Sequence, residues 1–242
     1  MRAAIILAVL CSPLVAGTTD DAVPDARYVE YGRGFSTYTC KVSGVGGDGR
    51  RASASCTLLT PHWAITAAHV VHGCTDVIVT SGTLPRAAAT VVIHPEWQRD
   101  VHGLHDLALV RCDEPLELDF FPALSDGDEH VGQVVSIAGY GLHGRLTEGH
   151  TDHDGRLRAG TQTIERFDRS LIVCHAACGT SVLELCISPG DSGGPLFADG
   201  RLAGVNSFTM AAKGATLKSR QGEETAHTRV SLYREWILGL VR

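Results

Sequence analysis

The sequence predicts an all-β fold, a sandwich or a barrel, and two observations support this prediction. Short stretches rich in Val, Ile, Leu, Thr and Phe recur between Gly, Pro and Asp residues, a pattern typical of many short antiparallel strands. One strong helical periodicity occurs, and it lies at the C-terminal end. The strands expected from this pattern are 64–67, 77–80, 90–93, 107–111, 134–139 and 202–208.

Composition is that of an ordinary globular protein. The chain has 242 residues, of which 44% are hydrophobic and 20% charged, so it can bury a substantial core without a metal or a partner. Its 21 Lys and Arg against 27 Asp and Glu give a formal net charge of -6. Because this charge offers no general attraction for phosphate backbones or anionic lipid, we expect neither nucleic acid nor a membrane as partner. No cofactor and no metal are expected.

The N-terminus has the pattern of a signal peptide over residues 1–17. Arg2 gives a basic start, residues 3–10 are apolar, and small residues follow over 12–17. A membrane anchor is the alternative, but the apolar run is shorter than the roughly 20 residues that span a bilayer. We therefore expect a secreted protein, either extracellular or periplasmic.

The cysteines fit an oxidising compartment. Without Cys11 the chain keeps seven, an odd number that predicts disulfides plus one unpaired thiol. A zinc site is the competing interpretation, because Cys174, His175 and Cys178 are close in sequence and Cys186 follows. In a secreted chain a disulfide is the more common use of such residues.

Three further features complete the expected organisation. The segment 141–160 is crowded with Gly, His, Asp and Arg and lacks apolar periodicity, which predicts an exposed loop with solvated histidines. The segment 115–122 is the expected crossing between two halves, 18–118 and 119–242. Residues 230–242 place apolar side chains at three- and four-residue steps, which predicts an amphipathic helix docked on the body.

The segment Gly190-Asp191-Ser192-Gly193-Gly194-Pro195 carries the clearest chemical information. Its glycines permit a tight turn that exposes one hydroxyl and directs main-chain N–H groups at a common point. Serine alone is a poor nucleophile, so Ser192 needs a base within hydrogen-bond reach, and that base needs a carboxylate to orient it.

Two other segments supply the missing groups. His69 follows the strand-like run Trp63-Ala64-Ile65-Thr66-Ala67-Ala68, and Asp106 immediately precedes the apolar run Leu107-Ala108-Leu109-Val110. Taken separately, a histidine is usually structural and an aspartate before a strand usually belongs to a turn. Their joint presence with the serine segment predicts a catalytic triad of His69, Asp106 and Ser192.

These three segments resemble the signatures of the chymotrypsin and trypsin family of serine proteases, in that family's order of His, Asp and Ser. Secondary matches, such as Ala138-Gly139-Tyr140-Gly141 and Thr228-Arg229-Val230, extend the resemblance over most of the chain. The resemblance implies two six-stranded antiparallel β-barrels with the active site in the cleft between them, and a C-terminal helix.

The resemblance also implies roles for individual residues. Gly190 and Ser192 would donate backbone N–H groups to the oxyanion, and Ser207 would brace the catalytic aspartate. Asp191 would pair with a freed N-terminal ammonium, although the family's usual Ile-Val-Gly-Gly start is absent. That terminus would arise either near Thr18, where a signal peptidase cuts, or after Arg27.

The substrate pocket is expected from the same resemblance. Its residues would be Cys186, Ser207, Phe208, Thr209 and Thr225. Cys186 stands where an aspartate selects Arg or Lys, and the two threonines narrow the pocket, so small side chains before the scissile bond are expected. An acidic preference, with His227 and Thr209 receiving a carboxylate, is the alternative. Bridges of Cys56 with Cys74, and of Cys186 with Cys174 or Cys178, are expected.

The function expected from all these features is that of a secreted serine endopeptidase. Its partners would be protein or peptide substrates and protein protease inhibitors, and the chain would be a monomer. A catalytically silent binding module on the same fold is the alternative. An esterase is disfavoured because the βαβ alternation of that fold is absent.

Overall fold

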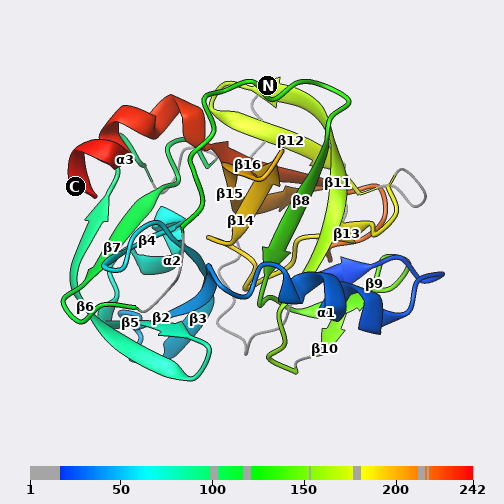
Figure 1. The fold of residues 1–242 in the computed structure, drawn as a ribbon. Helices are drawn as coiled ribbons and strands as arrows, with labels where there is room; N and C mark the ends of the chain where they lie inside the picture. The colour runs from blue at the N-terminus through cyan, green and yellow to red at the C-terminus, as the bar shows by residue number, and fades with distance from the viewer. Residues whose placement is uncertain are drawn as a thin grey trace.

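Two closed six-stranded antiparallel barrels lie side by side in the computed structural model (Figure 1), as predicted. The structure describes residues 17–98, 103–116, 121–152, 154–176, 181–211, 216 and 218–241. The predicted strands are all present, with ends that shift by a few residues.

The first barrel is formed by a continuous stretch of the chain, and its strands pair in the order β2-β3-β4-β7-β6-β5. Buried residues on alternate positions fill its interior, among them Cys40 and Val42 of β2 and Ala108, Val110 and Cys112 of β7. Its strands are β2 (Thr39–Val45), β3 (Arg51–Leu58), β4 (Trp63–Thr66), β5 (Thr75–Ser81), β6 (Leu84–Ile93) and β7 (Ala108–Cys112).

The second barrel has the order β11-β12-β16-β15-β14-β8. Its interior is less uniformly apolar, because Gln162, Asn206, Thr225 and His227 are all fully buried beside the aliphatic residues. Its strands are β8 (Val134–Gly139), β11 (Arg158–Asp168), β12 (Leu171–His175), β14 (Pro195–Ala198), β15 (Arg201–Met210) and β16 (Glu224–Arg229).

A third, small sheet corrects the expectation of an unstructured loop over 141–160. Its strands are β1 (Thr18–Thr19), β9 (His143–Arg145), β10 (Gly149–Asp152) and β13 (Leu185–Cys186), in the order β10-β9-β1-β13. β1 pairs parallel to β9 and antiparallel to β13, so residues far apart in sequence form these strands. Local sequence periodicity cannot reveal such pairing.

Each end of the chain packs on the barrel formed by the other half (Figure 1). Helix α1 (Asp25–Arg33) contacts β11, where the buried Arg158 donates from Nε and Nη2 to the two carboxylate oxygens of Asp25 at 2.6 and 2.8 Å. The expected division places residues 18–33 in the first half, whereas helix α1 packs on β11 of the second barrel.

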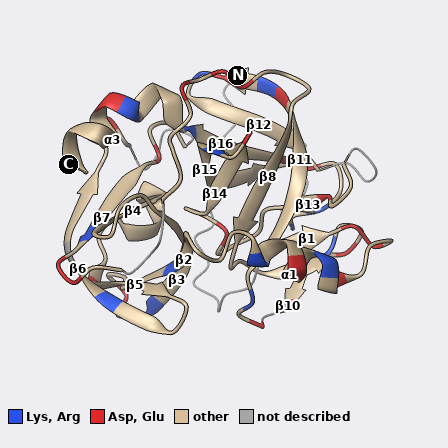
Figure 2. Ribbon diagram, viewed as in Figure 1, with Lys and Arg blue, Asp and Glu red and all other residues tan. Residues whose placement is uncertain are grey.

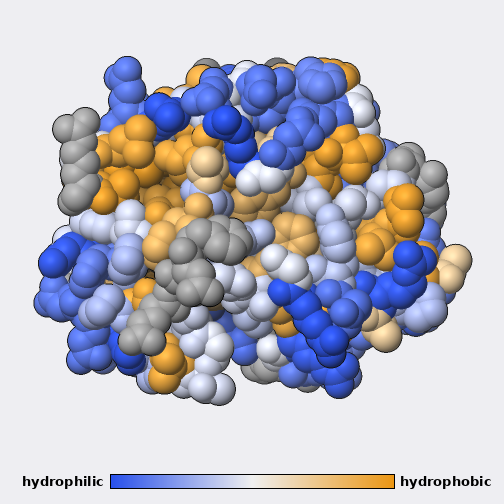
Figure 3. All heavy atoms as spheres, viewed as in Figure 1, coloured by the Kyte–Doolittle hydropathy of each residue, from blue (hydrophilic) through white to orange (hydrophobic). Residues whose placement is uncertain are grey.

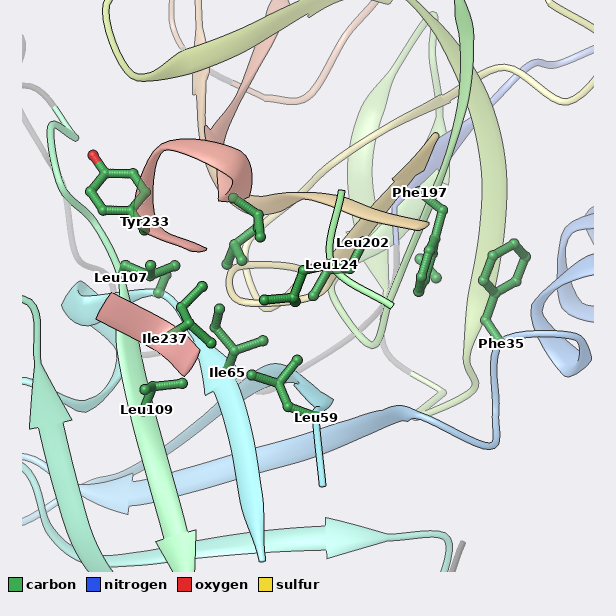
Figure 4. Packing of buried hydrophobic residues seen from close by; sticks show 14 of the residues in the cluster. Phe35, Leu59, Ile65, Leu107, Leu109, Leu124, Phe197, Leu202, Tyr233 and Ile237 are labelled. Atoms are coloured by element: carbon green, nitrogen blue, oxygen red, sulfur yellow. The ribbon is translucent and has the colours of Figure 1, made fainter. Parts of the chain in front are cut away.

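The predicted C-terminal helix is present as a 3-10 turn, η1 (Val230–Tyr233), followed by α3 (Arg234–Leu240). Ile237 of α3 is buried in one cluster with Ile65, Leu107 and Leu109 of the first barrel (Figure 4). This cluster also contains Phe197 and Leu202 of the second barrel, so it joins the two barrels. The joined barrels hold the segments around His69, Asp106 and Ser192 in fixed relation.

Charged residues of both signs are interspersed over the molecule (Figure 2), and hydrophobic surface gathers on the side where α3 lies (Figure 3). Among the described residues, no helix has the length and apolar character needed to cross a membrane. His143, in the segment that was expected to be a loop, places its Nε2 3.9 Å from Asp154 Oδ2.

The described cysteines are free thiols, so the bridges expected between Cys56 and Cys74 and between Cys174 and Cys186 are not formed. Cys174 and Cys186 lie in different buried clusters, and Cys56 faces Cys40 across β2 and β3. Cys178 lies outside the described residues, as do any bridges that it would form.

Candidate active site

His69 lies on the four-residue helix α2 (Ala68–Val71), directly after strand β4. Ala67 and Ala68 are fully buried, which anchors the turn, while the histidine side chain keeps 24% of its surface exposed. Its Nδ1 lies 2.7 Å from Asp106 Oδ2, and its backbone N–H donates to Asp106 Oδ1 at 2.9 Å. Two contacts to one carboxylate therefore fix both the position and the plane of the imidazole.

Asp106 is buried between the two barrels, at the start of the segment leading into β7. The hydroxyl of Ser207, on β15, also donates to Asp106 Oδ2. Burial alone would raise the pKa of Asp106, but the charge and hydrogen bonds of His69, with the hydrogen bond from Ser207, lower it. For the pKa of His69, the lowering effect of burial is outweighed by Asp106, which raises it.

Ser192 lies in a turn between β13 and β14 that also contains Gly193. Its hydroxyl donates to the backbone carbonyl of Ser207 at 3.3 Å, and within the described residues it makes no hydrogen bond with His69. Such bonds are often formed only in the substrate complex. A Cβ at Gly193 would lie 2.0 Å from Thr66 Oγ1 and 2.2 Å from the carbonyl of Ser55, so only glycine fits there.

The backbone N–H groups of the serine turn divide into two sets. Those of Asp191, Gly193 and Gly194 donate to carbonyl groups at 2.7 to 2.9 Å. Those of Gly190 and Ser192 have no acceptor among the described residues. Gly190 adopts a φ of 97°, which L side chains rarely reach and which orients its peptide group in the turn. Two N–H groups without an acceptor in the described part of the chain therefore lie beside the Ser192 hydroxyl, the arrangement that an oxyanion pocket requires.

Asp191 is fully enclosed and accepts only neutral donors. The backbone N–H groups of Gly141, Ser188 and Gly17 donate to its carboxylate at 2.7, 2.8 and 2.9 Å. No Lys or Arg of the described chain pairs with it. Burial is the largest influence on its pKa and raises it to about 6. Ser188, which stands where the family has a cysteine, also accepts from Gly17 N at 3.2 Å.

The expected pocket residues differ in their exposure to solvent. Cys186 and Thr225 are fully buried, Ser207 is nearly so, and Phe208 and Thr209 are half-buried. Thr209 and Thr225 face each other across β15 and β16. A Cβ added to Gly103 would lie 2.1 Å from the ring of Phe208, so this ring packs against the segment leading to Asp106.

His227 does not fit the role of a charged acceptor for an acidic side chain. It is fully buried, its Nε2 lies 2.9 Å from Thr225 Oγ1, and its Nδ1 lies 2.9 Å from Asn206 Oδ1. Burial lowers its pKa to about 3, so the ring is neutral at neutral pH. The alternative of a carboxylate bound by His227 is therefore not supported, because both ring nitrogens are occupied and the charge is absent.

Two closed barrels with a histidine–aspartate pair facing a serine turn define a serine peptidase of the double-barrel class. The family model described as Trypsin matches residues 31–237, and the chain belongs to this family. It is a trypsin-like serine endopeptidase, whose substrates are proteins or peptides.

Individual relatives agree with this family. An uncharacterised peptidase of Corynebacterium glutamicum is 27% identical over 235 residues, covering 93% of this chain and 76% of the relative. Brachyurin of Leptuca pugilator is 28% identical over 195 residues, covering 75% of this chain and 84% of the relative. The structure of neuropsin from mouse brain has a TM-score of 0.70 at 18% identity, covering 93% and 99% of the two chains. This structural match supports the fold.

Proposed function

We propose that this endopeptidase cleaves peptide bonds through an acyl-enzyme formed on Ser192. His69 would take the proton of the serine hydroxyl as it attacks the peptide carbonyl, and would later deliver that proton to the leaving amine. Asp106 would hold the imidazole with Nδ1 protonated and Nε2 free to accept. The N–H groups of Gly190 and Ser192 would stabilise the oxyanion. The observation that carries the proposal is the 2.7 Å contact between His69 Nδ1 and Asp106 Oδ2.

A fluorophosphonate probe tests this proposal directly, because it labels only an activated serine. The purified protein should be labelled on Ser192, as located by mass spectrometry, and the Ser192→Ala variant should not be labelled. A protein that stays unlabelled in every N-terminal form tested would support the silent binding module instead.

We propose a preference for small side chains before the scissile bond. Cys186 carries no negative charge that would attract Arg or Lys. Thr209 pairs with Thr225 on the neighbouring strand, and these two side chains would occupy space that a deep pocket needs. A peptide-library digest should therefore show cleavage mainly after small residues. Cleavage mainly after Arg, Lys or Glu would contradict this proposal.

We also propose that Gly17 is the N-terminal residue of the active enzyme. Its nitrogen already lies 2.9 Å from Asp191 Oδ2, and an ammonium there would neutralise the buried carboxylate. Removal of a signal peptide after Ala16 would create this ammonium during export. A cut after Arg27 fits less well, because it would divide α1. The segment that carries Asp25, the partner of Arg158, would no longer be joined to the fully buried Tyr28.

Secretion, a monomeric state and control by protein protease inhibitors complete the proposal. The N-terminal sequence pattern supports export. N-terminal sequencing of protein recovered from the medium or periplasm, together with light scattering, tests the first two, and titration with protein inhibitors tests the third.

A further inference from the structure

A group of three metal-ligand side chains lies next to the catalytic aspartate and has no part in the proposed reaction. His94, Glu96 and His105 each bring one donor atom to within 4.8 Å of the other two. His94 follows strand β6, and His105 immediately precedes Asp106. The two segments are tied together by the hydrogen bond from the backbone N–H of His94 to the carbonyl of Leu107, at 2.9 Å.

The two imidazole rings stack, with their planes 8° apart and their centroids separated by 5.4 Å. The carboxylate of Glu96 lies 3.7 Å from His105 Nδ1 and is 70% exposed, so it can move onto an ion from solvent.

Aromatic side chains next to the two histidines restrict the orientation of the imidazole rings. The hydroxyl of Tyr233 lies 3.0 Å from His105 Nδ1, and Figure 4 shows this hydroxyl pointing away from the hydrophobic cluster. The rings of Tyr233 and Trp236 pack edge-on against His94, each at a centroid distance of 4.9 Å. The two aromatic contacts hold the His94 ring in orientation, whereas an ion bound at His105 Nδ1 would displace the Tyr233 hydroxyl.

We propose that His94, Glu96 and His105 form a zinc site through which zinc ions inhibit the enzyme. Two imidazole nitrogens and one carboxylate oxygen are a donor set that Zn²⁺ prefers, and they leave a fourth position for water. Hard ions such as Mg²⁺ and Ca²⁺ prefer oxygen ligands and are expected to bind weakly.

The inhibition follows from the distances. Ligand atoms about 2 Å from a tetrahedral zinc ion lie roughly 3.3 Å from one another, so donors up to 4.8 Å apart must move inward. This movement pulls on His105, whose backbone has a strained φ of 57° and continues directly into Asp106. Displacing Asp106 would loosen its contacts with His69. The inhibitory effect rests on the proposed function, whereas zinc binding does not.

Binding is tested by calorimetric titration of zinc chloride into the Ser192→Ala protein, which removes any dependence on activity. One zinc ion should bind per chain, and Mg²⁺ should not compete. Glu96→Gln should weaken binding by more than about tenfold, and His94→Phe, which keeps an aromatic ring against Trp236, should do the same. Glu30→Gln and His130→Ala, at exposed positions, are the matched controls and should bind as the parent does.

Absence of zinc binding, or equal affinity in the Glu96→Gln and His94→Phe variants, would overturn the site. The three side chains would then be an aromatic and polar contact without a metal.

Inhibition is tested on the active enzyme. Zinc should lower kcat/KM, EDTA should restore it, and Glu96→Gln should need more than about tenfold higher zinc for the same loss. In the absence of zinc, Glu96→Gln should be as active as the parent. Zinc bound at this site without any loss of turnover would contradict the coupling to Asp106.

Discussion

Two aspartates are buried in the active-site region, and their surroundings differ. Asp106, at the edge of the first barrel, contacts His69, which can carry a positive charge. The charge and hydrogen bonds of His69 lower the pKa of Asp106. Asp191, beside the serine turn of the second barrel, receives only neutral hydrogen bonds, and burial raises its pKa to about 6. Both carboxylates are equally hidden from water, so burial does not account for the difference.

This difference in charge compensation distinguishes the Asp106 region, which needs no further group, from the Asp191 region, which needs a cation. The Asp106 region is assembled by the fold alone, because β4, α2 and the segment before β7 bring its groups together. The Asp191 region leaves a buried anion without a cation, which is costly. An ammonium at Gly17 would make the two regions alike in charge compensation.

The largest expected effect comes from removing the charge of Asp106. Asp106→Asn should lower kcat by about four orders of magnitude, because an amide stabilises the wrong histidine tautomer. The measurement is steady-state peptide hydrolysis. Asp113→Asn is the matched control, since Asp113 is an exposed aspartate at the other end of β7 that pairs with Arg111. Equal activity of the two variants would rule out the proposed role of Asp106.

The next effect concerns the serine turn. Gly190→Ala should lower kcat by about two to three orders of magnitude, because a side chain disfavours the φ of 97° that orients an oxyanion N–H group. Gly200→Ala is the matched control: Gly200 also has a positive φ, 76°, with open space around it, and it lies outside the serine turn, between β14 and β15. Similar turnover in both variants would contradict the oxyanion assignment.

A third prediction uses the raised pKa of Asp191 in a chain that extends beyond Gly17. An unfolded aspartate ionises near pH 3.8, whereas the folded one keeps its proton up to about pH 6. Stability should therefore fall as the pH rises between these values and stay lower above them, by about 3 kcal/mol in total. Urea unfolding of the parent and of Asp191→Asn over this pH range isolates the effect as a difference. If the difference in free energy of unfolding between the two proteins did not change with pH, another group would have to compensate the charge of Asp191.

The smallest effect is a shift in pH dependence. Because Asp106 raises the pKa of His69 above 6.5, kcat/KM should decline on the acid side with a midpoint above pH 6.5. The decline reflects protonation of the base, so the fold should be intact by circular dichroism at the same pH. A midpoint below 6.5 would mean that burial outweighs the charge of Asp106.

The sequence predicts the fold, and it predicts the contact between His69 and Asp106, because both follow from contiguous sequence patterns. The strands alternate visibly, and the segments around His69, Asp106 and Ser192 are each contiguous. The small sheet around β1 was not predictable, since it depends on pairing between residues more than 100 positions apart. The buried state of His227 also depends on three-dimensional packing, so the sequence could not show that both ring nitrogens of His227 are already occupied.

The chain's N-terminus offers the most direct test of the account. We compare kcat/KM for enzyme that begins at Gly17, for a form that retains Ser12 to Ala16, and for a form that begins at Tyr28. The account predicts that only the first is fully active and that the extended form is about a hundredfold or more weaker, because its Asp191 lacks a cation. Equal kcat/KM in the first two forms, or full activity in the third, would contradict it.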